Sequence, residues 1–228
     1  MKQLQPTSLE RAERLYLDLD LEAVRKWKAS HPGGKAIGFL PVHAPREVVA
    51  AAGCLPVAIR GGGATVETVR GDAYFQSYIC HLPRSVVEMG VSGRFAPLDG
   101  FLFPAICDVI RNLSGMWQIL FPDRYVRYLD LPQTTNRAIA LDFHRAELAA
   151  LLADLERLTG RKVGEADLRT AIASYDANRR EVARVLELRS RAPWLAPGSE
   201  VHLVLRAGDL LPVEEHTALL AAYRASAE

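Results

Sequence analysis

The sequence predicts an α/β protein built on a Rossmann-like parallel sheet of about four strands, with flanking helices and a helical C-terminal part. Up to residue 132, short apolar segments alternate with helical ones, which is the pattern of parallel strands joined by helical crossovers. After residue 132 the sequence is charged and follows helical periodicity. Hydrophobic residues make up 49% and charged residues 24% of the 228 residues, a balance that supplies a packed core.

Apolar periodicity and turn residues predict the elements in order. Residues 8–30 predict an amphipathic helix, broken near residues 18–20 and ended by the His-Pro-Gly-Gly run at 31–34. Apolar segments predict the strands at 35–41, 55–59, 100–104 and 125–130. Helices are expected between these strands at 46–52, 83–89 and 108–121, with Asp108 as the N-cap of the last. The stretch 64–79 predicts a helix followed by a loop.

Beyond the last strand, helical periodicity predicts helices at 143–158, 165–191 and 213–224. Residues 201–205 are apolar enough to form a strand, although the end of a helix fits them equally well. We therefore expect three parts in the chain: an N-terminal helical segment (1–34), a Rossmann-like domain (35–132) and a helical region (133–228).

Charge and hydropathy exclude several classes of protein. Lys and Arg number 28 against 27 Asp and Glu, so the chain lacks the basic excess of a nucleic-acid-binding protein. No apolar run is long enough to span a bilayer, and residues 1–6 lack the apolar core of a secretion signal. These features predict a cytoplasmic protein without nucleic-acid or membrane partners. Three cysteines, an odd number, argue against a disulfide framework.

Two cysteines are predicted to lie at the edge of the sheet where ligands bind. Cys107 follows the strand at 100–104 and precedes a helix, and Cys80 precedes a helix that Pro83 opens. A helix N-terminus favours the thiolate form of cysteine, and two soft ligands fit an iron–sulfur cluster or zinc. The alternative is burial as small apolar side chains, the usual role of free cysteine. No Cys-x-x-Cys pair is present.

Three further residues are weaker candidates. Cys54 enters the second strand at its amino end, which favours core packing over metal ligation. Glu47 follows the first strand and is either an acidic residue of a first helical turn or a group that orients substrate. His81 is adjacent to Cys80 and is either a base, a hydrogen-bond donor beside the ligand, or a solvated loop residue.

Phosphate-binding signals are weak. The triple glycine at 61–63 follows a strand, but a flexible turn fits it better than a phosphate cradle. Arg70, Arg84 and Arg111 are candidates for binding the phosphates of a CoA-type ligand or for ordinary ion pairs. No P-loop occurs, so any ATP chemistry belongs to a partner, and no Gly-x-Ser-x-Gly elbow supports serine hydrolase chemistry.

Three blocks of sequence resemble a known family. They are Gly38-Phe-Leu-Pro41 with Pro45-Arg-Glu-Val-Val-Ala-Ala-Ala-Gly-Cys-Leu-Pro-Val57; Arg70-Gly-Asp-Ala-Tyr-Phe-Gln-Ser-Tyr-Ile-Cys-His-Leu-Pro-Arg-Ser85; and Asp99-Gly-Phe-Leu-Phe-Pro-Ala-Ile-Cys-Asp-Val-Ile-Arg-Asn-Leu-Ser-Gly115. The chain resembles the N-terminal half of members of the 2-hydroxyacyl-CoA dehydratase D-component family, and within it the benzoyl-CoA reductase gamma-type (C) subunits. The resemblance covers nearly the whole chain, less tightly past residue 132.

The resemblance implies a [4Fe-4S] cluster held by three cysteines with one iron left open. Cys80 and Cys107 match two of those ligands, whereas Cys54 stands where relatives usually carry an apolar residue and is not carried over. The third ligand is expected in a second Rossmann-like domain, which this sequence lacks. A natural fragment, a disrupted gene and one piece of a split subunit are the alternatives for the short chain.

The family further implies a hetero-oligomer with a sister cluster-binding subunit, ATPase activator subunits and an acyl-CoA thioester substrate. The expected function is ATP-dependent, anaerobic reduction of the aromatic ring of benzoyl-CoA, an oxidoreductase activity in aromatic degradation. The block that ends at Cys80 favours this branch. The alternatives are a 2-hydroxyacyl-CoA dehydratase subunit with the same cluster, or a truncated, cluster-free structural or interaction domain.

Overall fold

The computed structural model describes residues 7–228. Residues 1–6, which carry the expectation that no secretion signal is present, lie outside the described residues. Among the helices of residues 7–228, none combines the length and apolar character that a bilayer span requires.

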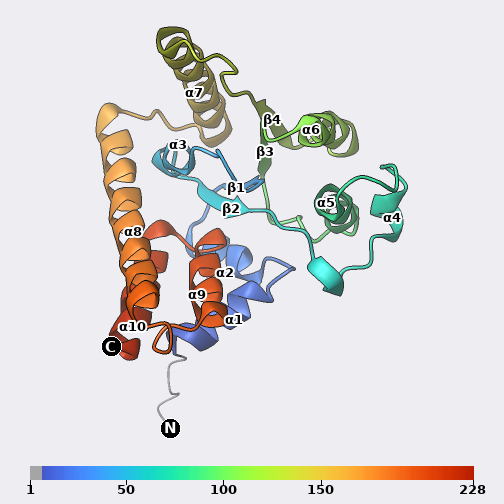
Figure 1. Cartoon of the computed structure of the whole chain (residues 1–228). Helices are drawn as coiled ribbons and strands as arrows, with labels where there is room; N and C mark the ends of the chain where they lie inside the picture. The colour runs from blue at the N-terminus through green and yellow to red at the C-terminus, as the bar shows by residue number, and fades with distance from the viewer. Residues whose placement is uncertain (1–6) are drawn as a thin grey trace.

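A four-stranded sheet forms the centre of the fold (Figure 1). All pairings are parallel, and the strand order is β2-β1-β3-β4. The fold class is therefore confirmed as α/β with a Rossmann-like sheet. The first three strands along the chain are buried along their whole length, as expected for apolar strands covered on both faces. The strands are β1 (Ala36–Phe39), β2 (Leu55–Ala58), β3 (Gly100–Pro104) and β4 (Tyr125–Leu129).

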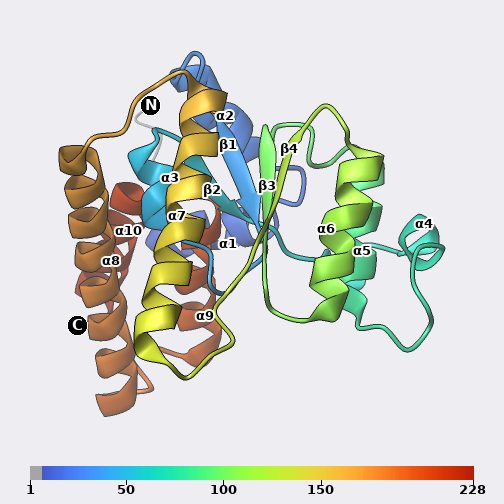
Figure 2. The same ribbon diagram turned by 90° about the horizontal axis from the view of Figure 1, so that it is seen from above.

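Helices cover both faces of the sheet (Figures 1 and 2). α3 (Arg46–Ala51) and α7 (Arg137–Thr159) pack on one face through apolar residues such as Val49 and Leu155. α5 (His81–Val91) and α6 (Asp108–Leu120) pack on the other face. The arrangement is doubly wound, because the crossover after β1 and the crossover after β3 lie on opposite faces.

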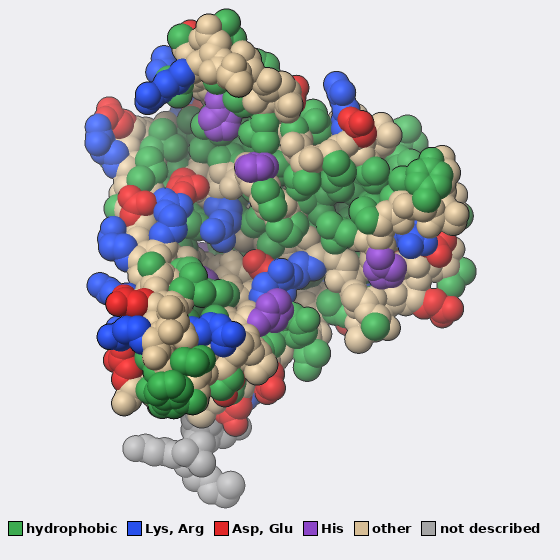
Figure 3. Space-filling model, viewed as in Figure 1, with side chains coloured by type: hydrophobic (Ala, Val, Ile, Leu, Met, Phe, Trp, Pro, Cys, Tyr) green, Lys and Arg blue, Asp and Glu red, His purple; other side chains and the backbone are tan. Residues whose placement is uncertain are grey.

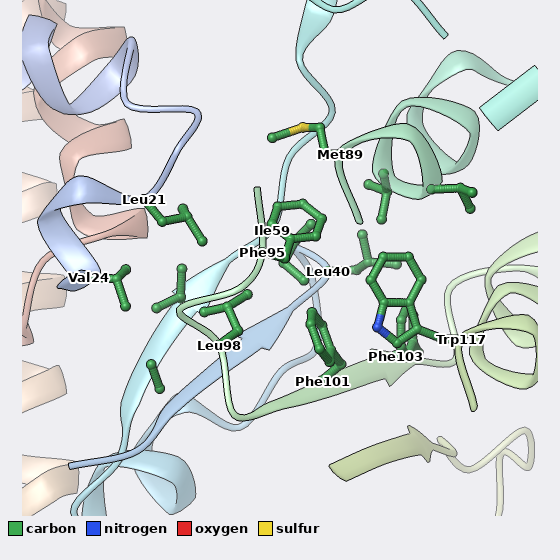
Figure 4. Packing of buried hydrophobic residues seen from close by; sticks show 14 of the residues in the cluster. Leu21, Val24, Leu40, Ile59, Met89, Phe95, Leu98, Phe101, Phe103 and Trp117 are labelled. Atoms are coloured by element: carbon green, nitrogen blue, oxygen red, sulfur yellow. The ribbon is translucent and has the colours of Figure 1, made fainter. Parts of the chain in front are cut away.

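Aromatic packing between the sheet and α6 centres on Trp117 (Figure 4). Its side chain is fully buried, and its ring centroid lies 5.1 Å from that of Phe101 and 5.7 Å from that of Phe103. Phe95, in the loop before β3, packs against the same indole at 6.1 Å. This cluster fixes α6, and hence the loop that precedes α6, against the sheet.

The predicted break in the N-terminal helix is confirmed. α1 (Ser8–Tyr16) begins with a capping box between Thr7 and Glu10. The chain then turns through Leu21, which has a positive φ of 58°, into α2 (Glu22–Ser30). The carboxylate of Asp18 accepts the first backbone N–H groups of α2, both at 2.8 Å, so a second helix begins where the first one ends.

The C-terminal region is helical and packs with α1 in a separate apolar cluster. Its elements are α8 (Glu165–Arg191), α9 (Gly198–Arg206), the short 3-10 turn η2 (Ala207–Asp209) and α10 (Val213–Ala227). Residues 201–205, open between strand and helix from sequence, belong to α9. The bounds of α8 match the predicted helix at 165–191.

Three local predictions need correction. Within residues 64–79, after the end of η1 (Gly63–Thr65), the predicted helix is reduced to one turn, α4 (Val69–Asp72), which the predicted loop follows. α7 begins at Arg137 rather than at residue 143, because the side chain of Asn136 accepts the N–H groups of Ala138 and Ile139. Asp108 is the first helical residue of α6 and not its N-cap, since the extended backbone of Cys107 occupies the capping position.

Candidate functional site at the carboxyl edge of the sheet

The doubly wound topology defines a switch point between β1 and β3. The chain leaves β1 toward α3 on one face and leaves β3 toward α6 on the other, so their loops diverge at the carboxyl edge. Open α/β sheets bind ligands in the crevice that this divergence creates. Figure 1 looks onto this edge, which lies at the bottom of Figure 2.

The backbone after β1 is strained at this edge. Val42 has a φ of 83° and His43 a φ of 59°, both in the left-handed region that glycine favours. Both side chains are exposed, so core packing does not demand this conformation. Strain of this kind gathers at binding and catalytic sites, and it supports a functional role for the β1–α3 loop.

Cys80 occupies the capping position of α5. It is exposed, its backbone is extended at ψ 151°, and no side chain caps this helix end. Pro83 fits in the first turn, where its missing N–H has no intrahelical partner to lose. The start of α5 is held to the end of β2 by Ser85, whose buried hydroxyl accepts the Gly62 N–H at 2.7 Å.

Cys107 occupies the same position before α6. It is exposed, its backbone is extended at φ −162° and ψ 170°, and again no side chain caps the helix. The preceding segment is tied to the sheet, since the N–H of Ala105 donates to the carbonyl of Leu129 at 2.9 Å. Asp108, in the first turn, complements the positive end of the helix dipole.

The fold brings the N-termini of α5 and α6 to one edge. The two helices contact each other and run side by side, with both N-termini at the carboxyl edge (Figure 2). Each helix end leaves backbone N–H groups without intrahelical partners, and these groups favour anionic sulfur. Cys80 and Cys107 are thus exposed thiols, each directly before the first turn of a helix.

The exposed thiols of Cys80 and Cys107 are the soft donors that the described residues offer at this edge. Within residues 7–228, no group of three or more His, Cys, Asp or Glu side chains is arranged to hold a metal ion. A thiolate-bound iron–sulfur cluster or a structural zinc site needs more ligands than two. The remaining ligands of such a centre would therefore come from outside these residues.

Cys54 lies in a different environment. It precedes β2 at the amino edge of the sheet and is only 5% exposed within the apolar cluster under α3 and α7. Burial, assisted by the negative charge of Asp99, raises the pKa of its thiol to about 12. A thiol that stays protonated at neutral pH is a core side chain and a poor ligand.

Glu47 forms an ion pair within the fold, whereas His81 is exposed at the sheet edge. Glu47 lies in the first turn of α3, where its carboxylate accepts a 2.6 Å bond from Nη1 of Arg179 and thereby links α3 to α8. His81 is the first residue of α5, is exposed and lies next to Cys80. The geometry thus engages Glu47 in a structural ion pair and leaves His81 at the candidate site.

Most of the candidate phosphate-binding groups already have partners within the protein. Gly62 already donates its N–H to Ser85, which supports a turn at the triple glycine. Arg70 pairs with Glu88, and Arg84 pairs with Asp72 at 3.0 Å. Arg111 lies over the ring of Tyr128, 5.9 Å from its centroid, and takes part in none of the ion pairs among residues 7–228.

Two features of this edge were missed from sequence. The first is Tyr128 on β4, whose half-buried phenol lies in the electrostatic environment of Cys107 and Arg111; burial, with Asp130, raises its pKa. The second is an apolar surface across the strand ends (Figure 3). The exposed large apolar side chains in the loops and first turns that follow the strands are Val42, Tyr74, Tyr78, Leu82, Ile106, Ile139, Leu141 and Phe143. The sequence offers Tyr74, Phe75 and Tyr78, which precede Cys80, either as a shield of a site from water or as core residues; Tyr74 and Tyr78 are exposed on this edge.

A doubly wound sheet with two exposed thiols at its carboxyl edge defines an α/β protein with a candidate thiolate-ligand site. Residues 41–228 match the model of the family described as 2-hydroxyglutaryl-CoA dehydratase, D-component, and the chain belongs to this family. The resemblance inferred from the sequence blocks is confirmed.

Named relatives include components of two kinds of enzyme. The chain is 50% identical over 219 residues to the C subunit of benzoyl-CoA reductase from Thauera aromatica, an alignment that covers 96% of this chain and 57% of the relative. It is 30% identical to lactoyl-CoA dehydratase subunit beta of Anaerotignum propionicum, over 87% of this chain and 52% of the relative. It is 31% identical to (R)-2-hydroxyglutaryl-CoA dehydratase subunit beta of Acidaminococcus fermentans, over 84% of this chain and 50% of the relative. The chain spans about half the length of these curated relatives.

Proposed function

We propose that this chain supplies Cys80 and Cys107 as two thiolate ligands of a [4Fe-4S] cluster in an enzyme of the benzoyl-CoA reductase type. One observation carries the proposal: both thiols are exposed at the uncapped N-termini of neighbouring helices on one edge of the sheet. Free cysteines are usually buried, as Cys54 is, so two exposed thiols in matching positions favour a chemical role.

Low-potential electrons are the chemistry that such a cluster supplies when bound. The chain's own contribution is to place the two sulfurs at the helix N-termini and to present exposed apolar side chains beside them. An apolar surface suits an aromatic acyl group, and closure by a second protein surface would exclude water from it.

The substrate class follows from the relatives' names and from the surface. Identity of 50% to the C subunit of benzoyl-CoA reductase, against 30–31% to the dehydratase subunits, favours an aromatic acyl-CoA thioester and its reduction. The alternative is a 2-hydroxyacyl-CoA dehydratase subunit, which the family description favours. A cluster-free interaction domain is the third possibility, and the exposed apolar surface favours that one.

Partners are part of the proposal. The chain offers two thiols where a cluster needs more, and its sequence contains no P-loop. We therefore infer a cytoplasmic hetero-oligomer in which other polypeptide segments complete the cluster, a sister subunit lies beside it and an ATPase activator delivers electrons.

Anaerobic reconstitution tests the ligand assignment. The chain would be co-purified with its partner subunits, supplied with iron and sulfide, and measured for iron content and for the EPR spectrum of the reduced protein. Cys80→Ser and Cys107→Ser should each lower the iron content and alter the EPR signal, whereas Cys54→Ser should retain both. Unchanged iron content in both exposed-site variants would overturn the proposal.

Substrate assays on the same complex separate the two enzyme activities. With ATP and a strong reductant, the reductase consumes benzoyl-CoA and oxidises the reductant in proportion. A dehydratase instead converts a 2-hydroxyacyl-CoA to the enoyl-CoA without net consumption of reductant. A metal-free complex that turns over neither thioester would support the interaction domain.

A further inference from the structure

Glu88 is a buried carboxylate with no role in the site described above. It lies in α5 between apolar neighbours and is 7% exposed. Its Oε2 accepts the backbone N–H of Arg70 at 2.6 Å and that of Gly71 at 2.9 Å. A buried carboxylate is costly unless it is paired and hydrogen-bonded, so these bonds indicate a specific structural task.

That task is to cap α4 from a different helix. Arg70 and Gly71 are the second and third residues of α4, the positions whose N–H groups an N-cap side chain normally satisfies. Thr68, the residue at the capping position, makes no such side-chain bond. Glu88 supplies the missing acceptor, and its carboxylate also pairs with Nε of Arg70 at 3.4 Å.

Two further contacts hold α4 against α5. A side chain at Gly71 would place its Cβ 2.0 Å from the carbonyl oxygen of Arg84, so only glycine allows the backbones to come this close. The next residue, Asp72, pairs with Nη1 of Arg84 at 3.0 Å. Each residue of the Arg-Gly-Asp sequence at 70–72 thus contacts α5.

These contacts lie at the start of the loop that leads to Cys80. Residues 73–80 leave α4 where its end contacts Arg84 of α5, and they enter α5 at His81, in the same first turn of that helix. Both ends of the loop are therefore fixed on α5, which restricts the positions available to the residues between them. We call Glu88, Gly71 and the Asp72–Arg84 pair the α4 latch.

We propose that Glu88 is a positioning residue for Cys80, acting through the α4 latch. This inference rests on the proposed function, in which Cys80 is a ligand. Ligand groups need to be held within a fraction of an ångström by a surrounding shell, and the latch is that support for the thiol on the 73–80 loop.

Hydrogen exchange on the metal-free chain tests the latch directly. Glu88→Ala should speed amide exchange in residues 69–80 by about tenfold or more, because the N–H groups of Arg70 and Gly71 lose their acceptor. Glu88→Gln keeps an acceptor oxygen and should restore most of the protection. Gly71→Ala should also speed exchange, through the clash with Arg84.

Glu181→Ala is the matched control. Glu181 is 4% exposed in α8 and pairs with Arg184 and Arg224, so its loss removes a buried carboxylate far from the loop in sequence and in packing. In the Glu181→Ala variant, amide exchange in residues 69–80 should stay at the wild-type rate. Unchanged exchange in Glu88→Ala, or equal acceleration in Glu181→Ala, would overturn the latch.

Iron release measures the consequence for the site. In the reconstituted complex, Glu88→Ala should lose iron to a chelator about tenfold faster than the wild type, and Glu88→Gln should recover most of the difference. Wild-type release from Glu88→Ala would overturn the positioning role. If the wild-type complex binds no cluster, the proposed function fails and the ligand-positioning role fails with it, while the exchange result still decides whether Glu88 orders the loop.

Discussion

Cys80 and Cys107 occupy equivalent positions in the fold, since each is the last residue before the first turn of a helix and both are exposed. The helices that follow them, α5 and α6, pack on the same face of the sheet. A parallel sheet repeats the strand–loop–helix unit, and this repetition places residues distant in sequence in matching surroundings.

The three cysteine thiols should therefore fall into a fast-reacting and a slow-reacting class. Cys80 and Cys107 are exposed, whereas burial raises the pKa of Cys54 to about 12 and leaves little thiolate at pH 8. Titration of the metal-free chain with a chromogenic disulfide should show two fast thiols, and the third only in denaturant. A fast third thiol, or a single fast one, would contradict this assignment of environments.

Replacing Ser85 should loosen the start of α5. Ser85→Ala leaves the buried N–H of Gly62 without an acceptor, which should lower the free energy of unfolding by about 1–3 kcal/mol. Urea denaturation followed by circular dichroism measures this change. Ser190→Ala, at an exposed position of α8, is the control and should change stability by less than about 0.5 kcal/mol.

Truncating Trp117 should be far more severe than truncating Trp194. Trp117 is fully buried against Phe101 and Phe103, so Trp117→Ala should cost about 3–5 kcal/mol through lost burial and the cavity left behind. Trp194 is 75% exposed, and Trp194→Ala should change stability by less than about 0.5 kcal/mol. Similar denaturation midpoints for the two variants would mean that α6 is not held by this aromatic cluster.

His216 should make the C-terminal helices sensitive to acid. Its side chain is 5% exposed. Its Nε2 lies 3.0 Å from the carbonyl oxygen of Val204 and donates to it, while its Nδ1 lies 3.0 Å from Nδ2 of Asn178 and accepts from it. Because one ring nitrogen donates and the other accepts, the ring is neutral. Burial lowers its pKa, with a smaller contribution from Arg46.

The sign of the effect follows from linkage. Because the folded-state pKa lies below the unfolded value of about 6.5, the unfolded chain binds the proton more readily. The stabilisation is complete above that value and declines as the pH falls through it. Unfolding free energies measured between pH 5 and 8 should fall less steeply with acid in His216→Gln than in the wild type. Parallel curves would show that His216 does not titrate on unfolding.

The sequence is most informative where local pattern and tertiary packing agree. It predicts the strands correctly because each is a short apolar run, and it predicts α8 correctly because the apolar residues of α8 recur at helical spacing. It starts α7 too late because the first turns expose Ile139 and Leu141, which hides the amphipathic pattern. The helix within 64–79 is shorter than the sequence predicts because contacts with α5, distant in sequence, decide the shape of this stretch.

Sequence alone determined the α/β class, the family and the cysteines that fall between a strand or loop and a helix, because periodicity, turn residues and ordered motifs are local properties of the chain. Tertiary structure decided which cysteines are exposed, that Glu47 is engaged by Arg179, and that Glu88 caps α4. Those outcomes depend on burial and on partners up to 132 positions away, and neither is set until the helices pack on the sheet.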